Sequence, residues 1–117
     1  MMDQENLEQV EREIEISIEA ARETVERKDM MNELIRDKRF EQIFSVGYFE
    51  QEPARLVSLL ADPDWQTTEK QEDLLNDMRA ISSLRQYIMG IKTLGRQMEM
   101  QIARSQTELD NLRTEGE

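Results

Sequence analysis

The chain has 117 residues, 35% of them charged and 5% aromatic, which suits a single domain with a thin hydrophobic core. It contains no Cys and no His, so disulfides, thiol nucleophiles, histidine-based catalytic relays and zinc sites with nitrogen or sulfur ligands are excluded. The formal net charge of −11 disfavours direct binding to nucleic acid or anionic lipid, because both repel a negative surface. From these exclusions we expect a protein that is not an enzyme and uses no cofactor, metal ion or small-molecule substrate.

The apolar residues form no run that approaches the length of a membrane span, which is about 20 residues. Residues 1–10 also lack the basic start and the apolar centre of a secretory signal. We therefore expect no membrane association, and a location inside a cell or inside a particle.

The first predicted element is a long helix over residues 4–45. This stretch contains neither Pro nor Gly, and its apolar residues recur every three or four positions, as on one face of a helix. They are Leu7, Val10, Ile14, Ala21, Val25, Met31 and Ile35. Ser17, Thr24 and Lys28 interrupt this stripe, so the first helix is less regular than a coiled coil requires.

The middle of the chain is predicted to hold a short helix and an aromatic cluster. Gly47 is expected to end the first helix in the left-handed conformation, and Pro53 to begin a helix over residues 53–61. Asp62-Pro63-Asp64 then predicts a turn. The aromatic residues of this region are Phe40, Phe44, Tyr48, Phe49 and Trp65. Together with the short helix they are the one part of the chain that can form a core of globular type.

A second long helix is predicted over residues 68–114, with Thr68 and Gln71 as a capping box at its start. With Ile81 at heptad position a, ten successive a and d positions follow the spacing of a coiled coil, and eight of them are apolar. These positions are Ile81, Leu84, Ile88, Ile91, Gly95, Met98, Ile102, Ser105, Leu109 and Leu112. Gly90 and Gly95 weaken a helix, which indicates a close approach of another helix or a bend at these glycines, and we favour the close approach.

Charge is distributed unevenly between the two long helices. Residues 1–29 carry ten acidic and four basic side chains, whereas residues 79–104 carry five basic and one acidic. If Ser45 faces Thr68 across the junction, the helices lie antiparallel with Glu26 opposite Tyr87 and Glu11 opposite Ile102. The acidic flank then lies beside the basic one, as the complementary charges require. The predicted fold is therefore all-α, a long antiparallel helical hairpin or coiled coil with a short connecting helix, assembled as a dimer or higher oligomer. An extended dimer of the second helix is the alternative arrangement.

The charged clusters have simpler explanations than catalysis or ligand binding. The glutamates of residues 11–19 lack the histidine that accompanies glutamates in di-iron bundles, so we interpret them as a solvated helix face. Asp62 and Asp64 lack the further ligands of a calcium loop. The basic side chains of residues 79–96 have one aromatic neighbour, Tyr87, which is too few for stacking on nucleic-acid bases. We therefore expect these basic side chains to pair with glutamates.

Short motifs between positions 39 and 91 carry a resemblance. They are Arg39-Phe40, Gly47-Tyr48-Phe49 with Glu52, Arg55-Leu56-Val57, Leu60-Ala61-Asp62-Pro63, Arg79-Ala80-Ile81 and Leu84-Arg85-Gln86-Tyr87. In these motifs the chain resembles a group of small helical proteins encoded by tailed bacteriophages. The resemblance covers about half the chain and assigns no activity to any residue. It implies a context, namely a small phage protein that acts in virion assembly or on a host component.

Two hypotheses of function follow. The first is a non-enzymatic structural, scaffold or adaptor protein of phage virion assembly, which binds other proteins by docking of helices. The second is an acidic inhibitor that mimics nucleic acid and binds a nucleic-acid enzyme of the host or phage. Its phosphate surrogates would be Glu11, Glu15, Glu19, Glu23 and Glu26. Either protein would act in the host cytoplasm or inside a virion, with another protein as partner and with a tendency to form homo-oligomers.

The candidate interface residues come from the central aromatic residues and from the apolar stripe of the second helix. They are Phe40, Phe44, Tyr48, Phe49, Trp65, Ile81, Leu84, Ile88, Ile91, Met98 and Ile102. No catalytic, cofactor-binding or metal-binding residue is predicted.

Overall fold

The computed structural model describes residues 3–115, and within this range it contains helices and no strands, which confirms the predicted all-α class. The elements are α1 (Gln4–Arg36), α2 (Lys38–Phe40), the π-helix η1 (Glu41–Gln51), α3 (Glu52–Leu60), the 3-10 helix η2 (Pro63–Trp65) and α4 (Thr68–Glu115). They form two compact units. Within the described residues, unit 1 comprises residues 3–30 and 91–115, and unit 2 comprises residues 31–90. Residues 1–2 and 116–117, at the ends of the predicted single domain, lie outside the described residues.

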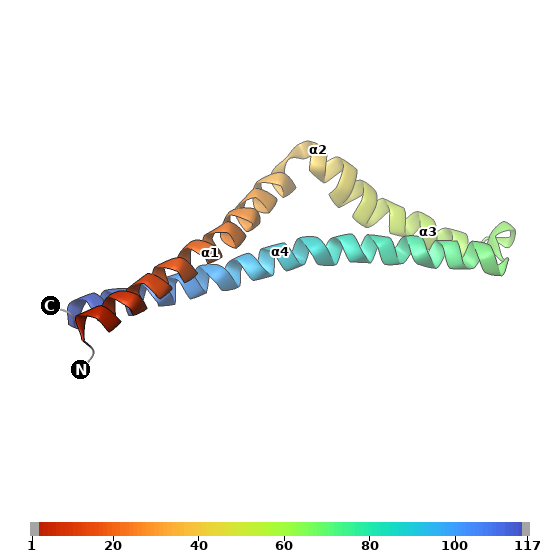
Figure 1. The fold of residues 1–117 in the computed structure, drawn as a ribbon. Helices are drawn as coiled ribbons and strands as arrows, with labels where there is room; N and C mark the ends of the chain where they lie inside the picture. Colours follow the sequence, from red (N-terminus) through yellow and green to blue (C-terminus); the bar gives the residue numbers. More distant parts are fainter. Residues whose placement is uncertain (1–2, 116–117) are drawn as a thin grey trace. The chain divides into compact units, whose positions relative to one another are not determined.

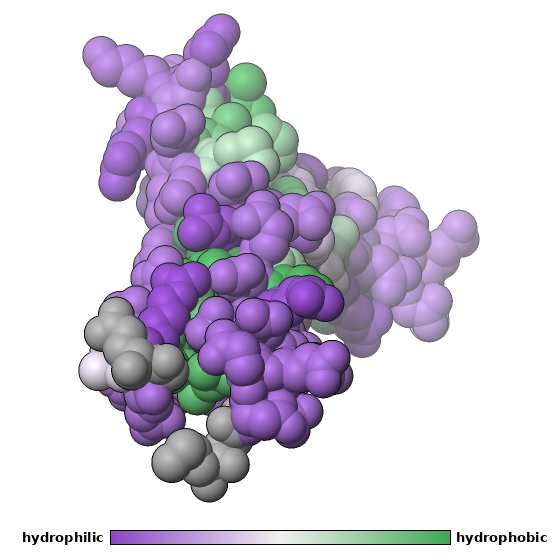
Figure 2. Space-filling view, turned by 60° about the vertical axis from the view of Figure 1, so that its left-hand side comes forward, coloured by the Kyte–Doolittle hydropathy of each residue, from purple (hydrophilic) through white to green (hydrophobic). Residues whose placement is uncertain are grey.

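Unit 1 pairs the first part of α1 with the last part of α4. The Gln4 end of α1 lies beside the Glu115 end of α4, so the two helices are antiparallel (Figure 1). The buried apolar residues of this unit are Leu7, Ile18, Ala21 and Leu109. On the face seen in Figure 2, hydrophilic side chains cover most of the surface, and hydrophobic ones show in smaller areas among them. A narrow apolar seam therefore holds unit 1 together.

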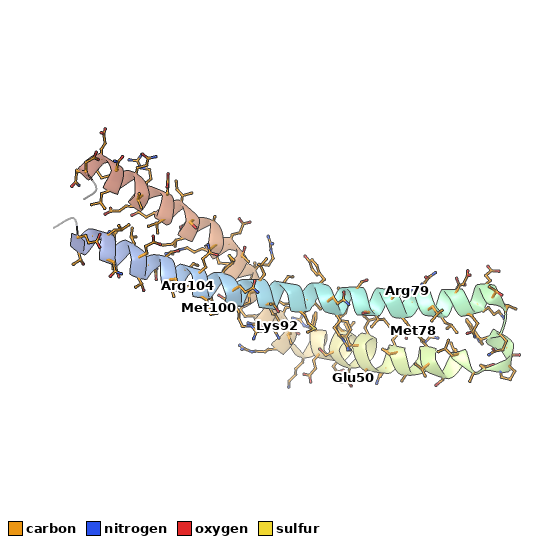
Figure 3. The ribbon with its side chains drawn as sticks, turned by 90° about the horizontal axis from the view of Figure 1, so that it is seen from below. Glu50, Met78, Arg79, Lys92, Met100 and Arg104 are labelled. Atoms are coloured by element: carbon orange, nitrogen blue, oxygen red, sulfur yellow. The ribbon has the colours of Figure 1, made fainter. Side chains whose placement is uncertain are left out.

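Unit 2 pairs α3 and the last part of η1 with the first part of α4. Leu56 of α3 forms its core with Leu74 and Ile81 of α4, and these residues are 1%, 2% and 5% exposed. Met78 packs against this core and points toward α3, whereas Arg79 points away from it (Figure 3). Within each unit, the predicted antiparallel pairing of helices is confirmed.

The first helix ends earlier than predicted. The expected helix over residues 4–45 is wrong at its end, because α1 stops at Arg36 and α2 begins at Lys38. Asp37 has an extended backbone, with φ −68° and ψ 129°, and its side chain accepts a hydrogen bond from the Arg39 amide at 2.8 Å. An aspartate in this position caps the helix that follows it and so competes with continuation of the helix before it.

Gly47 does not end a helix, which corrects the prediction made for it. It lies inside η1, and no described glycine has a positive φ. The Gly47 carbonyl accepts a hydrogen bond from the amide of Glu52, five residues ahead, which is the π-helical pattern. A Cβ atom on residue 47 would lie 3.0 Å from the Gln42 carbonyl oxygen, so a glycine relieves crowding within this widened helix.

The chain reverses in the segment from Ala61 to Thr67. Asp62 accepts a hydrogen bond from the Asp64 amide at 2.9 Å and so caps η2. The Gln71 side chain donates to the carbonyls of Leu60 and Trp65 at 3.2 and 2.6 Å. The predicted capping box at Thr68 is therefore wrong in detail. The hydroxyl of Thr67, not of Thr68, accepts a hydrogen bond from the Lys70 amide at 3.3 Å, and the Gln71 side chain binds the carbonyls of the turn instead.

The predicted alignment of the two arms is also wrong. In unit 1, Lys28 bonds to Glu99 and Glu15 bonds to Arg113, so paired positions sum to about 128 instead of the value near 113 that placed Glu26 opposite Tyr87 and Glu11 opposite Ile102. The alignment differs because the chain reverses its direction at another position than predicted. Because α3 pairs with α4 within unit 2 and the turn follows α3, the paired positions are centred on the turn segment and not near residues 56–57, as the predicted sum requires.

The heptad stripe of the second helix matches the burial in both units. All ten predicted positions from Ile81 to Leu112 are buried or half-buried. Gly95 is buried against Lys28, as a close helix approach predicts, whereas a Cβ added to Gly90 would meet no neighbouring atom within 4 Å. The prediction of a close approach is thus confirmed at Gly95 and wrong at Gly90.

Candidate protein-binding surfaces

An aromatic ladder runs along η1 in unit 2. The rings of Phe40 and Phe44 stack with centroids 5.0 Å apart, and Phe44 meets Tyr48 edge to face at 6.3 Å. Tyr48 in turn contacts Phe49, with centroids 5.6 Å apart. Residues four apart stack because they lie on one side of the helix, so four of the predicted interface aromatic residues form one continuous row.

The ladder divides into an inner end, which packs on the core of unit 2, and an outer end. Tyr48, Phe49 and Trp65 pack against the core of unit 2, so Trp65 folds back from the turn onto this core. Phe40 and Phe44 are half-buried and lie outside that core. The predicted interface aromatic residues therefore serve two purposes, since three belong to the core of unit 2 and two stand beyond it.

Arg85 of α4 binds the inner end of the ladder. Its guanidinium donates to the Phe49 carbonyl oxygen at 2.9 Å and lies 5.3 Å from the centroid of the Phe49 ring. The predicted pairing of Arg85 with a glutamate of the first helix is wrong, because the side chain instead satisfies a backbone acceptor and an aromatic face.

Ile43 adjoins the outer end of the ladder and is 63% exposed. We name Phe40, Ile43 and Phe44 the η1 patch. Ile43 is absent from the candidate interface residues, since nothing in the apolar spacing distinguishes a half-buried position from an exposed one. A hollow of about 530 Å³ on the same helix is lined by Lys38, Glu41, Gln42, Val46 and Gln51.

The remaining candidate residues occupy the seams. Leu84 and Ile88 are half-buried in unit 2, and Ile91, Met98 and Ile102 are half-buried in unit 1. These side chains follow the heptad positions that face the partner helix in each unit.

Lys28 is the one buried charged residue within the part of the chain that the structure describes, with 7% of its surface exposed. Its ammonium donates to the Glu99 carboxylate and lies 3.2 Å from the Asp29 carboxylate. The bond to Glu99 raises the pKa of Lys28, although burial opposes this increase. A Cβ on Gly95 would lie 2.7 Å from Lys28 Cγ and 2.9 Å from Cδ, so the glycine makes room for the lysine stem.

Sequence reasoning treated Lys28 as an interruption of the apolar stripe and did not foresee this arrangement. The signal that could have found it is the pairing of one charged seam residue with one seam glycine, Gly95. Each looks like a defect when its own helix is considered alone.

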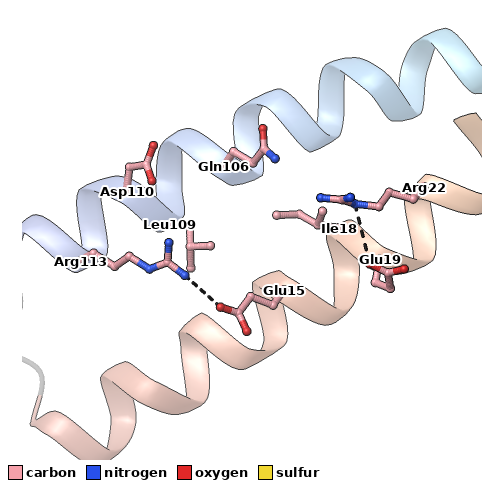
Figure 4. A pocket seen from close by; sticks show the side chains of 8 residues that line it. All are labelled: Glu15, Ile18, Glu19, Arg22, Gln106, Leu109, Asp110 and Arg113. Carbon is pink, nitrogen blue, oxygen red and sulfur yellow. Dashed lines mark hydrogen bonds and ion pairs between the residues drawn. The ribbon is translucent and has the colours of Figure 1, made fainter.

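Three of the five glutamates considered as phosphate mimics have basic partners within unit 1. The pairs are Glu15 with Arg113 at 3.0 Å, Glu19 with Arg22 at 3.8 Å and Glu23 with Arg27 at 3.8 Å. The first two lie at a hollow of about 410 Å³ whose walls carry side chains of both charges (Figure 4). These pairs lower the local negative charge that a mimic of nucleic acid would present.

The basic residues Lys92 and Arg96 differ from the prediction. Within residues 3–115, no ion pair joins either side chain to α1. Their expected glutamate partners lie elsewhere because the alignment of the two helices is shifted.

No protein-family model, curated protein or solved structure significantly matches this chain. Its interpretation rests on its own residues. Among the described residues, no helix is long and apolar enough to cross a membrane, and no group of three or more carboxylates could hold a metal ion.

Proposed function

We propose that this protein is a non-enzymatic adaptor or scaffold that binds another protein through the η1 patch. In accordance with the resemblance of residues 39–91, we further propose that it acts in the assembly of a phage particle, in the host cell or within the virion. The observation that carries the proposal is the combination of an exposed Ile43, at 63%, with two stacked phenylalanines that lie outside the core of unit 2.

The chemistry of the η1 patch suits a protein partner. Transfer of an exposed isoleucine side chain from water into an interface contributes about 1.5–3 kcal/mol. Phe40 and Phe44 add rigid, flat surface that loses little conformational entropy on binding, which is why aromatic residues are frequent at the energetic centres of interfaces.

The acidic-inhibitor hypothesis receives less support. A mimic of nucleic acid needs unpaired carboxylates at the spacing of phosphates, but Glu15, Glu19 and Glu23 each have a basic partner within unit 1. Of the five glutamates, only Glu11 and Glu26 lack an ion pair among the described residues.

A photoreactive amino acid at position 43 tests the proposal. The labelled protein is irradiated in an extract of its native source, the crosslinked protein is identified by mass spectrometry, and its binding is reconstituted with purified components. We expect a structural assembly protein, and we expect Ile43→Asp to weaken its binding by about tenfold or more.

Tyr87→Asp is the matched control, since Tyr87 is 64% exposed and also lies in unit 2. Both variants should retain the helical circular dichroism of the wild-type chain. Equal binding by wild type and Ile43→Asp would contradict the proposal. A nucleic-acid enzyme captured by a label at position 23 and not at position 43 would instead favour the inhibitor.

A further inference from the structure

The outer face of α4 in unit 1 carries a basic ridge. Arg96, Met100 and Arg104 are spaced by four residues and therefore lie in one row along the helix. Met100 is 63% exposed. It stands nine residues, or two and a half turns, before the buried Leu109, so the row faces away from the seam. We name Arg96, Met100 and Arg104 the α4 ridge.

The charge of the α4 ridge is not balanced within the described chain. The one acid between positions 92 and 104 is Glu99, and its carboxylate bonds to the buried Lys28. Among residues 3–115, no carboxylate forms an ion pair with Arg96 or Arg104. The ridge thus presents uncompensated positive charge around an exposed methionine, on a protein whose net charge is −11.

The outer face of α1 in unit 1 has the opposite character. Ile16 is 62% exposed and stands nine residues after the buried Leu7, so it also faces away from the seam. Glu13 lies three residues before it and Glu23 seven residues after it, on the same side of the helix, which also carries Arg12 and Arg27. Glu23 pairs with Arg27 at 3.8 Å, and such an exposed pair is weak enough for a second copy to replace it. The Glu23 side chain is 81% exposed. We name Glu13, Ile16 and Glu23 the α1 ridge.

We propose that the α4 ridge of one copy of this chain binds the α1 ridge of a second copy. The charges of the two ridges are complementary, and each ridge has an exposed apolar side chain among its charged residues that the contact would bury. The occupant is a second copy because the acidic face that the α4 ridge requires is present on the chain itself.

The two ridges lie on opposite sides of the same helix pair, which determines the kind of assembly. A contact between unlike faces is heterologous, and it leaves one α1 ridge and one α4 ridge free at the two ends. Copies therefore add side by side in a row. This inference concerns unit 1 and is independent of the partner proposed for the η1 patch.

Two variants, each with one ridge made neutral, test the inference by complementation. The α4 variant carries Arg96→Gln, Met100→Gln and Arg104→Gln, and the α1 variant carries Glu13→Gln, Ile16→Gln and Glu23→Gln. The matched control carries the same types of change on exposed positions of unit 2, namely Arg36→Gln, Arg79→Gln and Met89→Gln. Molar mass is measured by analytical ultracentrifugation over a wide range of protein concentration at low and high ionic strength, with helicity checked by circular dichroism.

We expect the wild type and the control to exceed the monomer mass of 13.9 kDa at low ionic strength, and to dissociate as salt screens the ion pairs. Each ridge variant alone should associate about tenfold or more weakly. Their equimolar mixture should form a complex limited to one copy of each, because only one intact pair of ridges remains.

Three results would overturn the inference. The first is a wild-type chain that stays monomeric under all conditions, which would mean that another protein covers these ridges. The second is an assembling wild type whose two ridge variants do not combine when mixed. The third is a control variant that dissociates as readily as the ridge variants.

Discussion

Replacement of Gly95 by alanine should destabilise the protein, whereas the same replacement at Gly90 should stabilise it. Both glycines lie in α4, five residues apart. Alanine is favoured over glycine in a helix interior by about 0.5–1 kcal/mol at either site. The two sites differ only in what the new methyl group would meet.

At Gly90 a Cβ would have no neighbour within 4 Å, so the full propensity gain of about 0.5–1 kcal/mol should appear, with a rise of about 2–6 °C in melting temperature. At Gly95 the new atom would overlap the Cβ of Lys28, with Cγ at 2.7 Å. Cβ is fixed to the backbone and cannot rotate away, so the helices must separate. Overpacking of this kind costs about 1–3 kcal/mol, which leaves a net loss of up to about 2 kcal/mol.

The assay is urea and thermal unfolding followed by helical circular dichroism, on the two single variants and on both in a Lys28→Gly background, because glycine also removes the Cβ that the new methyl group would meet. With the Lys28 side chain removed from Cβ outward, Gly95→Ala should become stabilising, and the double-mutant cycle should give a coupling of about 1–3 kcal/mol between positions 28 and 95. If Gly95→Ala stabilises the wild-type chain as much as Gly90→Ala does, the close packing of Lys28 on Gly95 is refuted.

Two further predictions concern unit 2. Leu56→Ala should lower the free energy of unfolding by about 2–5 kcal/mol, because Leu56 is 1% exposed. Val57→Ala, at a position 58% exposed, should change it by less than about 0.5 kcal/mol. Similar losses for the two variants in urea unfolding would contradict the assignment of Leu56 to the core. The Arg39 side chain and amide lower the pKa of Asp37, so its stabilising effect is present above the ordinary aspartate pKa and is lost as pH falls through the lowered value. Asp37→Asn keeps a capping side chain and should therefore flatten the acid side of a plot of melting temperature against pH, and an unchanged slope would exclude this role.

The second helix could be predicted from the sequence almost in full. Its heptad spacing from Ile81 to Leu112 is regular, and a regular apolar period is the strongest signal of a buried helix face. The turn at Asp62 and Pro63 could be predicted equally well, because an Asp-Pro pair favours the start of a turn.

The first arm was predicted less well, because its features depend on contacts distant in sequence. Asp37 lies within a helical pattern, and whether such a residue caps a new helix or points to solvent is decided by the fold around it. A glycine such as Gly47 often marks a helix end. Here, however, Tyr48 and Phe49 both pack on the core of unit 2, and the widened helix brings these two adjacent side chains to the core together.

The alignment of the arms could not be obtained from charge alone. Exposed ion pairs contribute only about 0.2–1 kcal/mol each, so a plausible set of pairs exists for several alignments. The candidate interface residues were only partly identified from the sequence, for a different reason. The spacing identifies Phe40 and Phe44 as apolar but contains no information on whether the core of unit 2 reaches them.

The contact between Lys28 and Gly95 also bears on misfolded states of unit 1. A slip of one heptad in one direction would place the Lys28 side chain against Ile102, with Gln106 in place of Glu99, and a slip in the other would bring it toward Lys92. Either competitor removes the Glu99 carboxylate and leaves the buried ammonium to its neighbour Asp29, which costs more than the loss of an exposed pair. A seam made only of leucine and isoleucine would tolerate such slips, whereas this one penalises them as the helices dock. The imperfect stripe of the first helix therefore protects the chain from kinetic traps.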